Sequence, residues 1–400
     1  MGAEVPKIDF TKIEGKSYGY YAICAIWLSI CIIGAYAYYL QWIHGHQVTG
    51  LNNQVPWGFG IAAVCYFIGA SAGSLIVSAL SGVFEKEEFK IFSRSAAFFA
   101  AAMIVAAMGA IFTDVGNPSN SINFLMYFNP TSIFSWNAFL YSSYFVVCVI
   151  YLIAQFEEKK FLTRCIAVFA VGWAVLVHSG TGAILGFIYS NDFYHSALTP
   201  PMFIISAIAS GLGLLIPTYI LTFKWTKREY DPSLFWTLTK IMGAMVIVLL
   251  YFFIVEGFEK GYMPASHEAF LRMITSPETP AVWVYWFGQI GLMLLALAIM
   301  LSPYRKTEKA MFVAGLLVAV AVFCERYILV VPGLSYPYEI FAGYEAVKPF
   351  QIVPYYPTWA EWAIELALLA GVYLAYCIGI KIFALLPEKA VKVEEVNKNE

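Results

Sequence analysis

Ten apolar segments of helix length divide this chain, and they limit what it can fold into more than any other feature. They lie at 18–43, 57–84, 95–115, 132–155, 165–189, 202–223, 234–256, 282–301, 310–331 and 359–386. Each has about 20 residues or more, enough for a helix to cross about 30 Å of hydrocarbon. Charged residues make up only 12% of the 400, against roughly 25% in soluble domains. The sequence therefore predicts an all-α integral membrane protein with about ten transmembrane helices in the lipid bilayer.

Positive charge is concentrated on one side of the predicted membrane. Of the 24 lysines and arginines, 20 fall in the N-terminal segment, in alternate connections or in the C-terminal segment. The opposite connections hold Lys260, Arg272 and Lys348, and Arg326 lies inside a helix. Because positively charged loops remain in the cytoplasm, we expect both termini there, as in a multi-pass protein of the cell (cytoplasmic) membrane. The net charge of -2 gives no reason to expect a nucleic-acid partner.

The order of the segments predicts how the helices are grouped. We expect a cytoplasmic N-terminal segment at 1–17, a transmembrane domain at 18–386 and a cytoplasmic tail at 387–400. Within the domain we expect two antiparallel four-helix bundles, at about 57–189 and 202–331, flanked by the first and tenth helices. The first helix is too long for the apolar part of a signal peptide, so we expect it to be retained.

Histidine and cysteine usage argues against a redox cofactor held by this protein. None of the seven cysteines forms a C-x-x-C pair, so we expect no iron–sulfur cluster. A membrane haem with two histidine ligands needs them on facing helices, yet His178 is the one histidine well inside an apolar segment. The others fall in outer connections or at their edges: His44, His46, His195 and His267. We therefore expect no haem.

Ionisable side chains inside the apolar segments are the candidates for function, because their burial in hydrocarbon is costly. Under the predicted orientation all of them lie in the outer halves of their helices, and the inner halves hold almost none. A full-width proton wire or ion channel needs polar groups at every depth, so this distribution argues against both. It favours a pocket in the outer leaflet that an apolar molecule enters from the lipid. The residues are Asp114, His178, Glu256, Glu325, Arg326, Glu361 and Glu365.

Several of these residues also have structural interpretations. Arg326 and a neighbouring glutamate can form a structural ion pair. Glu361 and Glu365 share a helix face at i and i+4, and we interpret Glu361 as wet at the membrane surface. Glu256 lies at a helix end, and glutamates at such positions lie at the membrane interface more often than they take part in catalysis.

His178 has no such explanation, because no membrane surface is near it. It begins the sequence His178-Ser179-Gly180-Thr181-Gly182. Gly182 and Gly186 allow close helix approach, and Ser179 and Thr181 can donate hydrogen bonds. Tight packing would explain the glycines of this segment, but it would not explain an imidazole beside them.

A set of short motifs resembles a known family. In sequence order they are Pro56-Trp57-Gly58, Thr113-Asp114-Val115-Gly116, His178 to Gly182, Glu325-Arg326, Pro332-Gly333 and Tyr356-Pro357-Thr358-Trp359 followed by Glu361. On ten helices this set resembles the NrfD/PsrC-like (polysulfide reductase NrfD) membrane subunits of quinone-linked respiratory complexes, in their ten-helix branch. Within that branch, the bare HSGTG segment and the lack of haem ligands favour the DsrP group of the sulfite-reduction-associated Dsr complexes.

The resemblance implies a function in electron transfer. It implies a quinone, here expected to be menaquinone, bound in a helix bundle near the outer face, with no haem or iron–sulfur cluster in this chain. Electrons would pass to or from an outer-side ferredoxin-like iron–sulfur subunit, beside other membrane and cytochrome subunits, in sulfur- or sulfite-linked respiration. His178 and Asp114 carry over as the proton-handling residues of the quinone site. The further pocket candidates are Ser179, Thr181, Gly182, Glu256 and Arg326.

Three alternatives remain open at this point. The protein could belong to a hydrogenase or a polysulfide-reductase-type complex. It could be a transporter without redox chemistry, which predicts polar residues near the membrane midplane and broken helices. It could also be an anchor that only holds partner subunits, which the intramembrane ionisable residues oppose.

Overall fold

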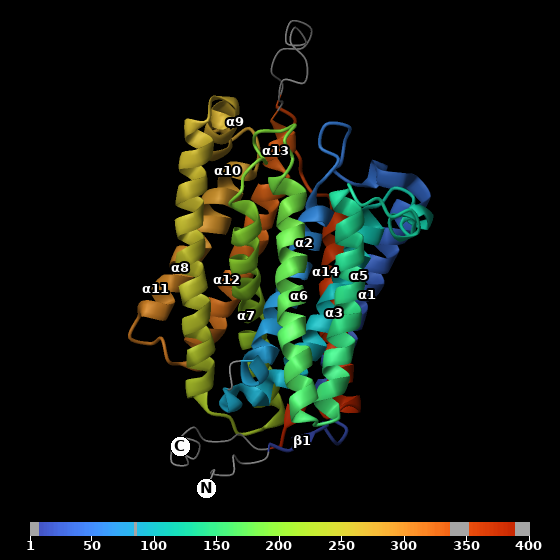
Figure 1. Ribbon diagram of the computed structural model, residues 1–400, viewed down its shortest axis with the longest axis vertical. Coiled ribbons are helices and arrows are strands. Elements are labelled where there is room, and N and C mark those ends of the chain that lie inside the picture. The colour runs from blue at the N-terminus through green and yellow to red at the C-terminus, as the bar shows by residue number, and fades with distance from the viewer. Residues whose placement is uncertain (1–7, 84–85, 337–351, 389–400) are drawn as a thin grey trace, which may run out of the picture.

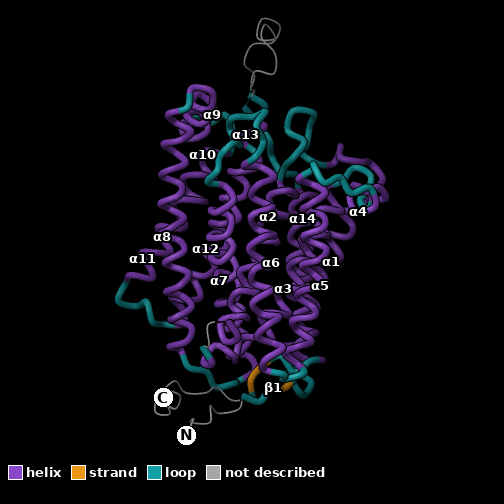
Figure 2. The backbone as a smooth tube through the Cα atoms, viewed as in Figure 1, coloured by secondary structure: helices purple, strands orange, loops and turns teal. Residues whose placement is uncertain are grey.

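The computed structural model describes residues 8–83, 86–336 and 352–388, and they are almost wholly helical (Figures 1 and 2). Within these ranges, ten segments are long and apolar enough to cross a membrane. This confirms the prediction of an all-α membrane protein with ten transmembrane helices. The predicted tail lies outside the described residues beyond Glu388, as do the first seven residues.

The spanning segments follow one another along the sequence. They are α1 (Tyr18–His44), α2 (Phe59–Val83), α3 (Lys90–Asp114), α5 (Ile133–Phe156), α6 (Lys160–Gly186), α7 (Thr199–Thr226), α8 (Pro232–Tyr262), an eighth span made of α10 (Ala281–Trp283), η4 (Val284–Gly291) and α11 (Leu292–Leu301), α12 (Glu308–Val330) and α14 (Trp359–Ile382). The short elements between them are β1 (Phe10–Thr11), η1 (Gly45–Val48), η2 (Glu87–Phe89), η3 (Pro118–Asn120), α4 (Asn123–Met126), α9 (Pro264–Thr275), α13 (Pro332–Ser335) and β2 (Leu386–Pro387).

The spans pack as two rings of four helices and one flanking pair. In the first ring α2 and α5 each pack against α3 and α6. In the second ring α7 and α11 each pack against α8 and α12. The rings meet where α7 packs against α2 and α6, and where α12 packs against α2. Helix α1 packs chiefly against α14, and α14 packs against α3 and α2, so this pair covers the first ring from outside (Figure 1).

Small residues allow the two rings to approach closely. The stretch Gly69 to Ser74 of α2 is entirely buried. A Cβ added at Gly211 of α7 would lie 2.7 Å from both the Gly73 Cα and the Ser74 nitrogen, so the two backbones are in direct contact. Small residues therefore allow α2 and α7 to pack closely at this junction, as they do between other membrane helices.

One end of the molecule is closed by a clasp of the two terminal segments. Strand β1 pairs antiparallel with β2, with Phe10 opposite Pro387. The Arg94 guanidinium lies 4.2 Å from the centre of the Phe10 ring, and Arg228 donates a hydrogen bond of 3.2 Å to the Leu386 carbonyl. The start of α1 and the end of α14 thus lie on the same side of the molecule. The distribution of positive charge predicts that this side faces the cytoplasm.

Candidate functional site

Three carboxylates from α3 and α14 meet at the N-terminal end of α2, at the end of the molecule away from the clasp, and we call them the acidic pocket: Asp114, Glu361 and Glu365. A Cβ added at Gly60 of α2 would lie 3.0 Å from Asp114 Oδ1 and 3.5 Å from Glu365 Oε1. The two carboxylates therefore converge on the bare backbone of Gly60. Glu361 interacts electrostatically with both. Asp114 is half-buried, whereas Glu361 and Glu365 are buried.

Glu361 was expected to be wet at the membrane surface, and that interpretation is wrong. It is only 7% exposed and accepts hydrogen bonds of 2.8 Å from the backbone nitrogens of Gly50 and Thr358. With Thr358 it forms the capping box that begins α14. Tyr355 also donates a hydrogen bond from its hydroxyl to Glu361. Burial, and after it the Glu361 charge, raises the pKa of Tyr355, so this hydroxyl stays protonated and can donate. Glu361 is thus held by donors and has a structural role.

A large cavity, which we call the groove, begins beside this pocket. Its volume is about 1180 Å³, and it runs between the α1–α14 pair and helices α7 and α12, with α2 also contributing to its wall. Charged residues line it at two places: Glu14 and Arg228 near the clasp, and Glu365 in the acidic pocket. Aromatic side chains make up much of the remaining lining, among them Phe59, Tyr66, Phe323, Tyr327, Trp362 and Tyr373.

Glu365 is the polar group that the groove leaves without a partner. It is 6% exposed, and its Oε2 atom has no hydrogen-bond partner among the described residues. A buried carboxylate oxygen without a donor is costly, so Glu365, which lines the groove, has a hydrogen-bonding need that the described residues leave unmet. The sequence placed Glu365 on one face with Glu361 but did not single it out. Only the packing of α14 against the groove distinguishes the two glutamates.

His178 lies deeper, where α6 meets α2 and α7. It is 1% exposed, and neither ring nitrogen has a hydrogen-bond partner among the described residues. A Cβ at Gly69 would lie 3.5 Å from its Nε2 atom. Arg326 of α12 is its charged neighbour, so His178 belongs to a polar site at the junction of the two rings.

Arg326 forms the ion pair that the sequence allowed. Its Nη1 atom lies 2.9 Å from Glu325 Oε1, and both side chains are almost fully buried. Arg326 also donates a hydrogen bond to Ser206 of α7, and its guanidinium stacks 3.7 Å from the centre of the Phe203 ring. These contacts hold α12 against α7.

The two expected proton-handling residues are not brought together. Asp114 lies against Gly60 and His178 against Gly69. These glycines are nine residues apart on α2, which is about 13 Å along a helix axis. The sequence placed both residues in the outer halves of their helices, but it could not resolve a difference in depth of about two and a half turns. Asp114 and His178 therefore belong to separate sites.

The other residues of the HSGTG segment pack the helix. Thr181 donates a hydrogen bond of 2.8 Å to the Val177 carbonyl and lies 3.0 Å from the Tyr141 hydroxyl. A Cβ at Gly182 would lie 2.7 Å from the Pro200 Cα, so this glycine is needed where α6 meets α7. Ser179 is half-buried.

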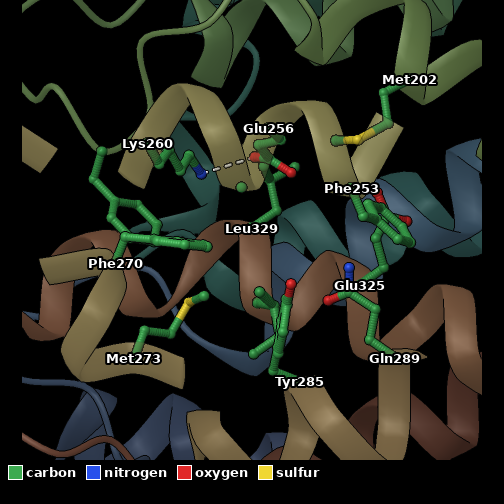
Figure 3. Close-up of a pocket in the computed structure, with 13 residues that line it drawn as sticks. Met202, Phe253, Glu256, Lys260, Phe270, Met273, Tyr285, Gln289, Glu325 and Leu329 are labelled. Carbon is green, nitrogen blue, oxygen red and sulfur yellow. Dashed lines mark ion pairs between the residues drawn. The ribbon is translucent and has the colours of Figure 1, made fainter. Parts of the chain in front are cut away.

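Glu256 belongs to a second and smaller cavity inside the second ring, which we call the chamber. Its volume is about 20 Å³, and the polar residues that line it are Glu256, Lys260, Tyr285, Gln289 and Glu325 (Figure 3). Glu256 forms an ion pair of 2.8 Å with Lys260, and both side chains are mostly buried. Lys260, Tyr285 and Gln289 were not predicted as site residues. The charge of Lys260 and its i+4 spacing from Glu256 could have indicated the ion pair, whereas Tyr285 and Gln289 have no such signal in the sequence.

Comparisons with known proteins give a consistent result. Residues 47–337 match the family described as polysulphide reductase, NrfD. The Hdr-like menaquinol oxidoreductase integral membrane subunit of Archaeoglobus fulgidus is 50% identical over 97% of this chain and 100% of its own length. The menaquinone reductase integral membrane subunit of Nitratidesulfovibrio vulgaris is 23% identical over 91% of this chain and 92% of its own length. One polypeptide of the polysulfide reductase of Wolinella succinogenes is 23% identical over 71% of this chain and 96% of its own length.

Proposed function

This chain belongs to the NrfD polysulphide reductase family, and from that membership we propose that it is the menaquinol-binding membrane subunit of an oxidoreductase complex. It exchanges electrons between the menaquinone pool and an outer-side ferredoxin-like iron–sulfur subunit, in sulfur-linked respiration. Three relatives are named for menaquinol, menaquinone or polysulfide, which supports this substrate class. In this proposal the chain itself holds no haem or iron–sulfur cluster. Membership of the DsrP group remains a prediction.

The groove carries the proposal, because its chemistry fits a quinol. Its volume of about 1180 Å³ exceeds the roughly 300–1,000 Å³ of ordinary ligand pockets, as a ring with a long isoprenoid tail requires. Aromatic and aliphatic side chains line its length. Glu365 adds, at the outer end, an unpartnered acceptor for a ring hydroxyl.

The residues of the acidic pocket can perform the proton chemistry. Oxidation of a quinol releases two electrons and two protons, and it needs a base within hydrogen-bond reach of a ring hydroxyl. We assign Glu365 as the base that contacts this hydroxyl and Asp114, beside it at Gly60, as the second proton acceptor. The two electrons pass to the partner subunit. The same residues return the protons when the reaction runs toward quinol.

We assign His178 a proton-transfer role at the junction of the two rings, outside the groove. Its two unpartnered ring nitrogens and its charged neighbour Arg326 support this assignment. A histidine that only filled space would have at least one nitrogen bonded to a neighbouring carbonyl or hydroxyl. Of the other predicted pocket residues, we assign Thr181 and Gly182 to packing.

The Glu365→Gln variant of the intact complex tests the proposal. The amide keeps the shape of the side chain and removes the base, so we expect quinol-dependent electron transfer to fall about 10²-fold, as for loss of a general base. Glu157→Gln, at an exposed glutamate paired with Lys159, is the matched control and should stay within about twofold of the parent protein. Normal turnover by Glu365→Gln, with menaquinone still copurifying, would place the quinone site elsewhere.

A transporter without redox chemistry is the second candidate, and helix irregularity favours it. The eighth span contains the π-helix η4 (Val284–Gly291), and Pro217 lies inside α7 and lines the groove. Both spans stay continuous, and these irregular turns beside a cavity are the nearest feature here to the discontinuous helices that form transport sites. A flux of an ion or solute through proteoliposomes, in the absence of quinone and partner subunits, would favour this function over the proposed one.

A further inference from the structure

The chamber inside the second ring is lined by two carboxylates, those of Glu256 and Glu325. Glu256 comes from α8 and Glu325 from α12, and Figure 3 shows both beside the same small space. A volume of about 20 Å³ is room for about one water molecule. The apolar remainder of the wall includes Phe253, Phe270 and Leu329, which exclude further water.

Each carboxylate has its own cation. Lys260 lies 2.8 Å from Glu256, and Arg326 lies 2.9 Å from Glu325. Arg326 approaches from outside the chamber, because it is not among the lining residues. With all four groups ionised the charges balance. The remaining ionisable group in the wall is Tyr285, from the eighth span, and His178 lies beyond Arg326.

Two buried oxygens of the chamber lack a hydrogen donor. Glu325 Oε2 and Gln289 Oε1 have no hydrogen-bond partner among the described residues, although the two residues are only 2% and 3% exposed. Both atoms are acceptors, so neither can satisfy the other while Glu325 is ionised. The donors in the wall are the Lys260 ammonium, the Tyr285 hydroxyl and the Gln289 amide nitrogen, yet none of them bonds to either of these two oxygens. A water in the chamber, or a proton on one of the carboxylates, would meet this need.

A metal ion does not fit the same space. A hard cation such as Ca²⁺ takes 6–8 oxygen ligands, and the chamber offers those of Glu256, Glu325, Gln289 and Tyr285 beside the Lys260 ammonium. A proton needs only one carboxylate oxygen and one acceptor. The ligand class that the geometry favours is therefore the proton.

The π-helix η4 connects the chamber with the groove. Consecutive residues of this segment line different cavities, Val284 the groove and Tyr285 the chamber. The same segment carries Gln289 into the chamber. π-Helices are rare and occur frequently at functional sites. Only the thickness of the helical wall formed by η4 and α12 separates the two cavities.

We propose that the chamber is a proton-holding site, in which Glu256 and Glu325 share one excess proton through a single water. This inference rests on the proposed function for the source of the proton, which is one of the two released by each quinol oxidised. The proton adds to a carboxylate oxygen as an oxygen–hydrogen bond and leaves by the reverse step, so no other bond changes. Lys260, near the outer end of α8, lies on the side through which the proton leaves.

Infrared difference spectroscopy of the intact complex, over a pH titration without quinol, tests the site directly. The parent protein should show the carbonyl band of a buried protonated carboxyl, which shifts in D₂O. Glu325→Gln should remove this band, and Gln289→Leu, which deletes the facing acceptor, should move it. Glu268→Gln, on the exposed face of α9, is the matched control and should leave it unchanged.

The outcomes separate the chamber from the quinone site. Glu365→Gln should lose quinol turnover yet keep the band of the chamber, so failure of the proposed function leaves this test intact. If Glu325→Gln does not assemble, Gln289→Leu decides, because an unmoved band would overturn the proposal. A parent protein that oxidises quinol normally but lacks any band sensitive to these two substitutions would overturn it as well.

Discussion

Cys324 and Glu325 are consecutive residues of α12, yet Cys324 lines the groove and Glu325 lines the chamber. Helix α12 therefore separates the groove, whose lining is largely apolar, from the water-sized polar chamber. Residues on its two faces should affect different steps. Changes facing the groove should alter quinol binding, and changes facing the chamber should alter proton transfer.

The first prediction concerns orientation. Reporter fusions at the connections near Lys227 and Arg305 should report cytoplasm, because positive charge is concentrated there. A fusion near Asn120, in η3 at the opposite end, should report the outside. A reversal at any one of these points would contradict the predicted orientation and the outer position of the acidic pocket.

The second prediction concerns the bare backbone at Gly60. Gly60→Ala places a methyl group 3.0 Å from Asp114 Oδ1, so one carboxylate of the acidic pocket must move. We expect quinol turnover to fall at least about tenfold, since small misplacements of reacting groups cost up to about 10²-fold. Gly371→Ala on α14 has nothing within 4 Å of the new Cβ and is the matched control. Equal rates for the two variants would show that the pocket does not contact the substrate.

The third prediction separates His178 from Asp114. His178→Ala should assemble with its partner subunits and lose roughly 10²-fold or more of quinol-dependent electron transfer, as for loss of a general acid–base group. Menaquinone should still copurify, because His178 does not line the groove. Asp114→Asn should reduce the rate and also alter quinone binding through its neighbour Glu365, which lines the groove although Asp114 does not. His267→Ala, at an exposed position, serves as the control, and wild-type turnover by His178→Ala would make the residue structural.

The fourth prediction concerns stability at Glu361. Glu361→Ala leaves the Gly50 and Thr358 amides and the Tyr355 hydroxyl without their acceptor. A buried donor left unpaired costs about 1–3 kcal/mol, so we expect the unfolding free energy in detergent to fall by at least about 2 kcal/mol. The midpoint of denaturant unfolding measures this. No change would mean that water replaces the lost carboxylate and that Glu361 is accessible after all.

The sequence predicted the ten spans because hydropathy over about 20 residues is a local property. It also allowed an ion pair between Arg326 and a neighbouring glutamate, which the structure shows to be Glu325. It misplaced Glu361 because the donor amide of Gly50 lies on the first connection, far away in the sequence. The chamber could not be predicted, because the π-helical turn that brings Tyr285 and Gln289 into it has no signature in the apolar pattern.

The clasp between β1 and β2 has a consequence for biogenesis. Helix α1 is the first span to leave the ribosome, and its chief packing partner is α14, the last. Helix α1 must therefore wait in the lipid until α14 has been made, and the clasp then joins the segments that flank these two helices. A protein truncated before α14 should leave α1 exposed to quality-control proteases. A circular permutant that fuses the two ends and opens at an outer loop should still fold.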